Sequence, residues 1–418
     1  MKFSIENKLD INSIILYNNK EYNRKGGGFT DNFSEYFKEY FRKTDIWLWL
    51  FTIIATAYSL VLIGTMQRSG TYNYLFNQTI AIIIGIFIAV LLSLINYKYF
   101  IKRWYVFAGM GFFLAGLVFV FGVTVSGTDD TAWVKLPGGI TFQPSEFIKL
   151  CFIITFSKHL SYLQDNDGIK KLSGVAGLLI HVGVPALLIH IQGDDGAVLI
   201  FILIALVMSF MAGVQTRYYA ILGGSVAVGL PIIWSFFLNN EHRNRILALF
   251  DLDGNALTNY GWQQYQSKVS IASGGFSGAG LFNGNRVEYG IVPEQENDFI
   301  FTVAGEELGF IGCVLLLLVL FFICLRIIVD AKNAYENKGA FICYGVFAMI
   351  AAQTIINIGM VLGIIPVIGI TLPFFSSGGT SVMSMMIAIG LVQSVMNNQE
   401  KDMDKAKIRI GFRSRTKI

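Results

Sequence analysis

Apolar runs about as long as a bilayer is thick recur along this chain, and they constrain its fold more than any other feature. A helix needs about 20 mostly apolar residues to cross the hydrocarbon core, and a helix satisfies its backbone polar groups in lipid. The sequence therefore predicts an all-α polytopic membrane protein with about ten transmembrane helices. The expected spans are roughly 45–66, 74–96, 101–125, 144–163, 173–191, 197–214, 217–238, 299–329, 339–365 and 379–397.

The composition supports this fold class. Hydrophobic residues make up 54% of the chain and charged residues only 14%, whereas soluble domains carry about 25% charged residues. The net charge of +4 is small, so no nucleic-acid partner is expected. All four cysteines lie inside apolar runs, which argues against a disulfide framework.

The distribution of basic residues predicts the orientation of the chain. Ten spans place both termini on one side, and 25 Lys and Arg then fall on that side against 6 in the opposite loops. Under the positive-inside rule both termini are cytoplasmic. We expect a polar cytoplasmic tail over 1–44, a transmembrane domain over 45–397, and a basic cytoplasmic tail over 398–418. A large extracellular loop, 239–298, then joins the seventh and eighth helices.

This loop is rich in glycine and ends in an acidic side chain at a hydrophobic boundary. Asp298 stands directly before the apolar residues Phe299, Ile300 and Phe301. One interpretation is that Asn297 or Asp298 simply caps the following helix, where the helix dipole favours an acid. The other is that the glycines form a binding loop beside an exposed catalytic acid.

Further acids lie in or beside the apolar runs, where unpaired charge is costly. Glu146 and Lys149 share one face of a helix that starts at Pro144, so they form either a structural ion pair or the lining of a polar cavity. Glu306 and the adjacent Glu307 lie two turns into the eighth span, where Arg243 and Arg245 are candidate partners. Asp194 stands in a Gly-Asp-Asp-Gly segment that also reads as an exposed turn.

The connection between the last two spans contains helix-breaking residues. Pro366, Pro373 and the segment from Ser376 to Gly379 follow Asn357. Proline and glycine here permit a re-entrant backbone that lines a cavity, although a plain outer loop has the same composition.

Six segments together give the chain a family resemblance. They are GTDDTAWVKLPGGITFQPSEFIKL (127–150), QGDDGAVL (192–199), HRNRI (242–246), QSKVSIASGGFSGAGLFNG (266–284), PEQENDFIFTVAGEELGFIG (293–312) and NIGMVLGIIPVIGITLPFFSSGGTS (357–381). In this order they resemble the SEDS family (shape, elongation, division and sporulation), which includes RodA, FtsW and SpoVE. The phrases LPGGITFQPSEF and QSK…NGN…PEQ favour the RodA branch.

The resemblance implies a peptidoglycan glycosyltransferase that polymerises lipid II at the outer face of the bacterial cytoplasmic membrane, for cell elongation and shape. It places the family's essential loop aspartate on Asp298, its loop tryptophan on Trp133, and its ion pair on Glu146 and Lys149. Three further positions in the motifs are expected to contact substrate: Asp194, Glu306 and Ser377.

The expected chemistry assigns a task to each kind of residue. Sugar transfer from a lipid diphosphate needs a base on the acceptor hydroxyl, and Asp298 is predicted to act directly or by holding a divalent cation, Mg²⁺ or Mn²⁺. Basic side chains, namely Lys135, Arg243 and Arg245, are expected to bind the diphosphate.

The resemblance also implies a partner, a class B penicillin-binding protein that acts as transpeptidase, in addition to lipid II and membrane lipid. Three other functions fit the same residues. A lipid II flippase needs a similar polar cavity, a structural scaffold needs only the helices, and a division or sporulation paralogue shares the polymerase activity.

Overall fold

The computed structural model describes residues 38, 40–66, 74–124, 131–135, 141–238, 240–250 and 261–399. The chain divides into two compact units, Met1–Thr44 and Asp45–Ile418. The two predicted tails, 1–44 and 398–418, fall mostly outside the described residues. The second unit contains nearly all of the described residues.

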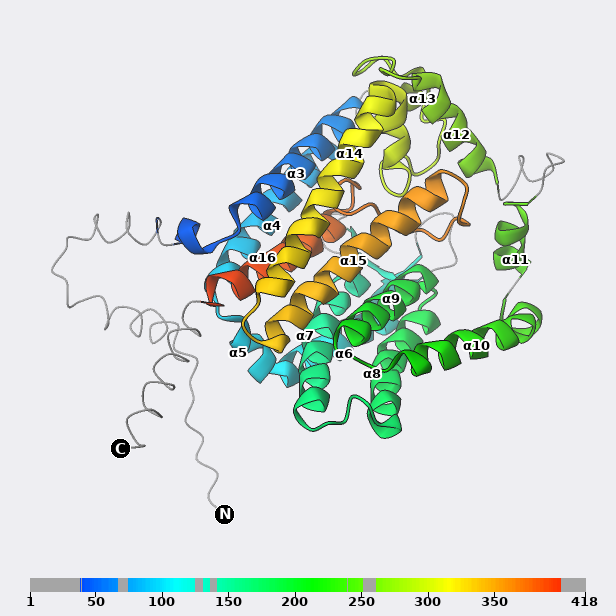
Figure 1. Cartoon of the computed structure of the whole chain (residues 1–418). Helices are drawn as coiled ribbons and strands as arrows, with labels where there is room; N and C mark the ends of the chain where they lie inside the picture. The colour runs from blue at the N-terminus through cyan, green and yellow to red at the C-terminus, as the bar shows by residue number, and fades with distance from the viewer. Residues whose placement is uncertain are drawn as a thin grey trace, which may run out of the picture. The chain divides into compact units, whose positions relative to one another are not determined.

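Helices build this unit (Figure 1). The long ones are α3 (Ile46–Met66), α4 (Tyr74–Leu94), α6 (Trp104–Phe121), α7 (Pro144–Asp165), α8 (Leu172–Ile191), α9 (Asp195–Met211), α10 (Thr216–Ile232), α14 (Ile300–Asn333), α15 (Asn337–Val361) and α16 (Gly379–Asn397). The short elements are α5 (Tyr97–Lys102), α11 (Asn240–Leu247), α12 (Trp262–Gly274), α13 (Asn285–Glu288) and the π-helical turn η2 (Ile233–Phe237).

The polytopic membrane fold is confirmed by these helices. Among the described residues, 8 helices are long and apolar enough to cross a membrane, and α9 is a shorter apolar helix. The number of ten spans stays a prediction, because α7 with its charged residues is not one of the 8. The expected span 101–125 is divided at Arg103, where α5 ends and α6 begins.

Close helix packing holds the unit together, since lipid provides little hydrophobic drive between helices. In Figure 1, α14 runs beside α15, and α3 lies along α14 and α4. The pair α4 and α16 is in especially close contact at Gly390, where an added Cβ would lie 2.7 Å from the Cα of Ala89. A larger side chain at Gly390 would force these helices apart.

A small antiparallel sheet connects α6 to α7. Strand β2 (Trp133–Lys135) pairs with β1 (Gly122–Val123) on one side and with β3 (Thr141–Phe142) on the other. The sheet therefore lies at the end of the bundle where α7 begins, which is also the end that carries the candidate site.

The helix α14 is broken, which differs from the single span expected over 299–329. Gly309 has φ 65° and ψ −158°, a conformation that a side chain would strain. The loop after α12 enters the break: the amides of Ala279 and Gly280 donate to the carbonyls of Glu306 and Glu307, at 2.9 Å each. In the other direction, the amide of Phe310 donates to the carbonyl of Gly275 at 3.0 Å. These bonds satisfy the backbone groups that the break exposes.

Candidate functional site

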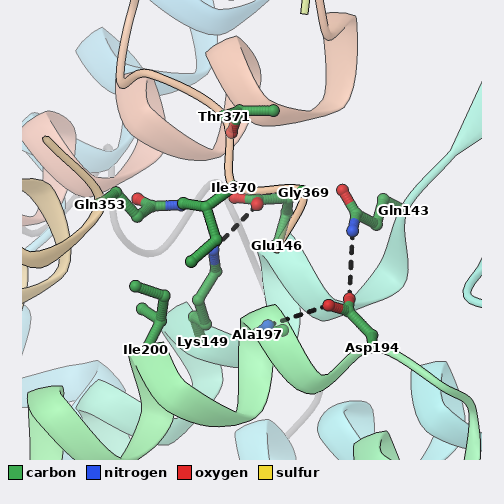
Figure 2. Close-up of a pocket in the computed structure, with 10 residues that line it drawn as sticks. All are labelled: Gln143, Glu146, Lys149, Asp194, Ala197, Ile200, Gln353, Gly369, Ile370 and Thr371. Atoms are coloured by element: carbon green, nitrogen blue, oxygen red, sulfur yellow. Dashed lines mark hydrogen bonds and ion pairs between the residues drawn. The ribbon is translucent and has the colours of Figure 1, made fainter. Parts of the chain in front are cut away.

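A small polar cavity lies where α7, α9 and α15 meet the segment between α15 and α16. Its volume is about 20 Å³, which is room for about one water molecule. Figure 2 shows the lining side chains. They are Gln143, Glu146, Lys149, Asp194, Ala197, Ile200, Gln353, Gly369, Ile370 and Thr371.

The predicted pair Glu146 and Lys149 forms one wall of this cavity. Pro144 starts α7, so the two side chains come one turn apart on the same face. Lys149 Nζ donates to Glu146 Oε1 at 2.8 Å, and Ser384 Oγ donates to Glu146 Oε2 at 2.9 Å. Both charged residues are buried. The pair is thus a structural ion pair and a cavity wall at once.

Asp194 forms the opposite wall (Figure 2). Its Oδ1 accepts from the amide of Ala197 at 2.9 Å and so caps α9. Its Oδ2 accepts from Gln143 Nε2 at 3.1 Å and from Ser145 Oγ at 2.9 Å. The alternative of a plain exposed turn is wrong, because this side chain is half-buried and joins the starts of α7 and α9.

Asp298 lies beside the cavity without lining it. An added Cβ on Gly369, which is a lining residue, would lie 3.6 Å from Asp298 Oδ2. The interpretation of Asp298 or Asn297 as a helix cap is wrong: the N-cap of α14 is Phe299, and no side chain makes a capping bond there. The side-chain Nδ2 of Asn297 instead donates a hydrogen bond to Glu294 Oε2 at 2.8 Å.

The surroundings of Asp298 favour the protonated acid. Burial raises the pKa of its carboxyl from 3.8 to about 7, and the negative charges of Glu294, Asp194 and Glu296 contribute to the rise. A carboxyl with a pKa near neutrality exchanges protons readily at physiological pH.

Two segments distant in sequence hold the Asp298 loop in place. The amide of Ser377 donates to the carbonyl of Glu296 at 2.8 Å, and Ser376 Oγ donates to the carbonyl of Asn297 at 2.7 Å. Asn357 Nδ2, on α15, donates both to the carbonyl of Asp298 at 2.8 Å and to that of Ile370 at 2.6 Å. The predicted residue Ser377 therefore acts here through its backbone.

Replacing Asn357 with alanine should lower the free energy of unfolding by about 1–3 kcal/mol, because two buried carbonyls lose their donor. Thermal unfolding of the purified variant in detergent measures this. Thr354→Val is the matched control, since it removes only a bond from Thr354 Oγ1 to the carbonyl of Ile350 in its own helix. Equal stability of the two variants would contradict the role of Asn357.

Sequence reasoning missed Gln353 and did not assign a contact to Asn357. Both amides lie on α15 four residues apart, so they share one helix face. Both are buried, and Gln353 Oε1 and Asn357 Oδ1 have no hydrogen-bond partner. Two amides at this spacing inside an apolar run were the available signal, since buried polar groups in membrane helices mark functional sites.

Six predicted substrate-binding residues do not line the cavity, and four of them, Trp133, Lys135, Arg243 and Arg245, lie on β2 or α11. Trp133 and Lys135 lie on β2, half-buried and exposed respectively. Arg243 Nη2 donates to the carbonyl of Ser235 at 2.9 Å, within the same loop region. Arg245 Nη1 donates to the carbonyl of Val367 at 3.2 Å, two residues before Gly369. Of the four, Arg245 thus has a contact with the segment that borders Asp298.

Glu306 and Glu307 are buried at the break in α14, away from the lining residues. Glu306 Oε1 accepts from the backbone amide of Arg286 at 2.7 Å. The expected side-chain partners Arg243 and Arg245 bond elsewhere. In the structure Glu306 therefore anchors the loop between α12 and α14.

The described part of the chain contains no group of three or more His, Cys, Asp or Glu placed to hold a metal ion. Asp298 is therefore not part of such a group and could offer a metal ion only its own carboxylate. A Mg²⁺ ion bound through one or two carboxylates plus substrate phosphates needs no such group.

Comparisons with known proteins identify the family of the chain. Residues 43–401 match the family of FtsW, RodA and SpoVE proteins, described as cell cycle proteins. The chain belongs to this family. It is 29% identical over 360 residues to the probable peptidoglycan glycosyltransferase FtsW of Geobacter sulfurreducens, covering 84% of this chain and 94% of that one.

Two other relatives of this chain carry names other than FtsW. Identity is 36% over 284 residues with the stage V sporulation protein E of Bacillus subtilis, covering 68% of this chain and 76% of that one. It is 32% over 268 residues with the peptidoglycan glycosyltransferase MrdB of Escherichia coli, covering 64% and 71%. The relatives thus share the family without selecting one branch of it.

Solved structures share the fold. The crystal structure of the rod shape determining protein RodA of Thermus thermophilus has a TM-score of 0.62 at 25% identity, covering 85% of this chain and 97% of that one. A structure described as "Structural coordination of polymerization and crosslinking by a peptidoglycan synthase complex" has a TM-score of 0.71 at 26% identity, covering 85% and 98%.

Proposed function

We propose that this chain is a peptidoglycan glycosyltransferase that polymerises lipid II into glycan strands. The observation that carries the proposal is Asp298, a half-buried carboxyl with a pKa of about 7 beside a polar cavity in a membrane bundle. The family membership and the names of the relatives support the same reaction class.

Asp298 is the general base in this reaction. Its carboxylate takes the proton from the acceptor sugar 4-hydroxyl while that oxygen attacks the anomeric carbon of the donor. The bond from that carbon to the diphosphate oxygen breaks, and the diphosphate leaves with the bonding electrons. A single displacement of this kind inverts the anomeric carbon. A base with a pKa near the working pH is suited to the transfer.

Basic and polar side chains at the predicted positions bind the substrate in this proposal. Arg245, Arg243 and Lys135 bind the diphosphate, for which guanidinium and ammonium groups are suited. Arg245 is the best supported, through its contact with the segment that contains Gly369. Of the remaining predicted positions, Glu146, Lys149 and Asp194 line the polar cavity, and Trp133, Glu306 and Ser377, which do not line it, stay predictions of substrate contact.

The rate of polymerisation should depend on pH through Asp298. A base works only when deprotonated, so kcat/KM should fall about tenfold for each pH unit below about 7 and level off above it. Glu294→Gln should move the midpoint to lower pH, because the negative charge of Glu294 helps to raise this pKa. A pH profile that is flat between about 5.5 and 8 would contradict the base assignment.

Asp298 acts in this proposal either directly as the base or by holding a divalent cation. Asp298 and the substrate diphosphate would share Mg²⁺ or Mn²⁺, which lends positive charge to the leaving group. Chelation with EDTA in the polymerisation assay, followed by addition of either ion, tests the requirement.

The protein works in the bacterial cytoplasmic membrane with both termini cytoplasmic and the Asp298 end outside, as the excess of basic residues on one side supports. Its partner is a class B penicillin-binding protein, in keeping with the similarity to a complex of polymerisation and crosslinking. Its cellular role is elongation and shape, which the RodA-like phrases support. A division or sporulation role with the same activity is the alternative, favoured by the similarity to FtsW and to the sporulation protein.

One experiment separates polymerase, flippase and scaffold. The purified protein is reconstituted in liposomes with lipid II, and both the products and the exposure of lipid II on each leaflet are followed. A glycan ladder supports the proposal. Translocation of lipid II without a ladder supports a flippase, and neither result, even with the transpeptidase partner added, supports a scaffold.

A further inference from the structure

A second cavity, apolar and larger, lies on the other side of α7. We propose that this groove, bounded by α6, α7 and α8, holds the isoprenoid chain of the lipid-linked substrate. The inference rests on the proposed function for the identity of the lipid, and on the groove itself for the site. The groove has a volume of about 260 Å³.

The lining of the groove is suited to hydrocarbon. Its walls are mainly aromatic and aliphatic side chains, among them Trp104, Phe107, Phe112, Phe152, Val184 and Leu188. Thr155 and His181 are the hydroxyl and imidazole side chains in this lining, and Trp104 and Cys151 add only an indole N–H and a thiol. An occupant with polar groups would need hydrogen-bond partners from these side chains.

Thr155 and His181 already have partners. Thr155 Oγ1 donates to the carbonyl of Phe152 at 3.1 Å, so it accepts from His181 Nε2, which lies 3.1 Å away. His181 Nδ1 then accepts from His159 Nδ1 at 3.0 Å. This network assigns the tautomers and pairs the Thr155 hydroxyl and both ring nitrogens of His181 with protein groups. The groove therefore selects a chain without polar groups.

The groove is accessible from the bilayer. Phe112 is 57% exposed, Ile180 67% and Val184 40%, all on spanning helices, so one flank faces lipid. The floor is hollow because α6 contributes Ala108, Gly111 and Ala115, residues with little or no side chain. A lipid chain can enter sideways without passing through water.

One end of the groove is joined to the polar site by hydrogen bonds. Gln192 Nε2 donates to the carbonyl of Ala115 at 3.1 Å, and the amide of Asp194 donates to the carbonyl of Ile189 at 3.3 Å. Ala115 and Ile189 line the groove, whereas Asp194 lines the polar cavity. A lipid with its chain in the groove has its head at the end where Asp194 and Asp298 lie. This continuity favours the substrate's chain over an unrelated phospholipid chain.

Two glycines of α6 provide a matched pair of variants. A Cβ on Gly111 would lie 3.7 Å from Cys151 Cβ, an ordinary contact, so the backbone accepts a side chain here and Gly111→Leu directs it into the groove. Gly109 has no atom within 4 Å of an added Cβ and does not line the groove. Gly109→Leu therefore makes the same change on the same helix but leaves the groove open.

The test uses a polyprenyl diphosphate with a diazirine near the middle of its chain, and the full-length protein in nanodiscs. Mass spectrometry should find the label on α6, α7 or α8, and unlabelled polyprenyl diphosphate should compete for it. Labelling should fall at least about tenfold in Gly111→Leu, because each buried methylene contributes several-fold to binding, and should be unchanged in Gly109→Leu. Labelling elsewhere, or equal labelling of the two variants, would overturn the proposal.

Two further arms separate the groove from its alternatives. A diazirine phosphatidylglycerol that labels the groove without competition from polyprenyl diphosphate means that bulk lipid occupies it, which also overturns the proposal. With lipid II as substrate, Gly111→Leu should raise KM about tenfold for the full-length chain and not for a short-chain analogue. If the protein does not polymerise lipid II, the proposed function fails. The labelling result then still decides whether the groove binds a polyprenyl chain.

Discussion

Replacing Asp298 with asparagine is expected to slow lipid II polymerisation at least ~100-fold, because the variant keeps the shape of the side chain but cannot take a proton. The hydrogen bond from Asn357 Nδ2 to the backbone carbonyl of residue 298 remains, so the loop should keep its conformation. The initial rate of polyprenyl diphosphate release measures the effect. Size-exclusion chromatography and thermal unfolding check that the variant is folded.

Glu294→Gln is the matched control for this variant. It makes the same acid-to-amide change in the same loop, on an exposed side chain. The glutamine oxygen can still accept the hydrogen bond that Asn297 Nδ2 donates to Glu294. At pH 8 its rate should stay within about threefold of the wild type, because its charge acts only through the pKa of Asp298. A large loss in both variants would mean that the loop needs its overall negative charge, and not a base at residue 298.

Replacing Lys149 with methionine is expected to cost about 3–5 kcal/mol of stability, since it leaves the buried Glu146 carboxylate without its ion-pair partner. The side chains of Lys149 and Glu146 are only 2% and 5% exposed, so bulk water cannot solvate the carboxylate that is left unpaired. The folded yield and the midpoint of thermal unfolding in detergent measure the loss.

The double variant Glu146→Gln with Lys149→Met should recover much of that stability. It removes both charges, and a glutamine oxygen can still accept the bond from Ser384 Oγ. If the double variant is less stable than Lys149→Met alone, the destabilisation does not come from an unpaired buried charge. A loss of polymerisation in a stable double variant would then show that the pair also serves the reaction.

The helices were predictable from the sequence because lipid leaves the backbone few alternatives. The expected span 379–397 coincides with α16, and 74–96 differs from α4 by two residues at one end. The break in α14 was not predictable, because it depends on bonds from residues 275–280, about thirty positions earlier. Gly309 alone does not reveal a partner so far away in sequence.

The sequence allowed many of the site residues to be predicted, but few of the contacts between them. Glu146 and Lys149 meet because helix periodicity places them together. The tie from Asn357 to Asp298 joins segments 59 positions apart, and no local pattern encodes it. Arg245 could be identified as basic and near the outer boundary, but its contact with the carbonyl of Val367 depends on how α11 approaches the bundle. Pairings between distant loops follow from tertiary packing.

We propose that this chain joins lipid II molecules through a base at Asp298. Gel electrophoresis of the products tests it most directly, after purified wild type and Asp298→Asn are incubated with lipid II in equal amounts of folded protein. We expect a glycan ladder from the wild type that lengthens with time, and unreacted lipid II from the variant. A ladder of equal intensity from Asp298→Asn would contradict the proposal.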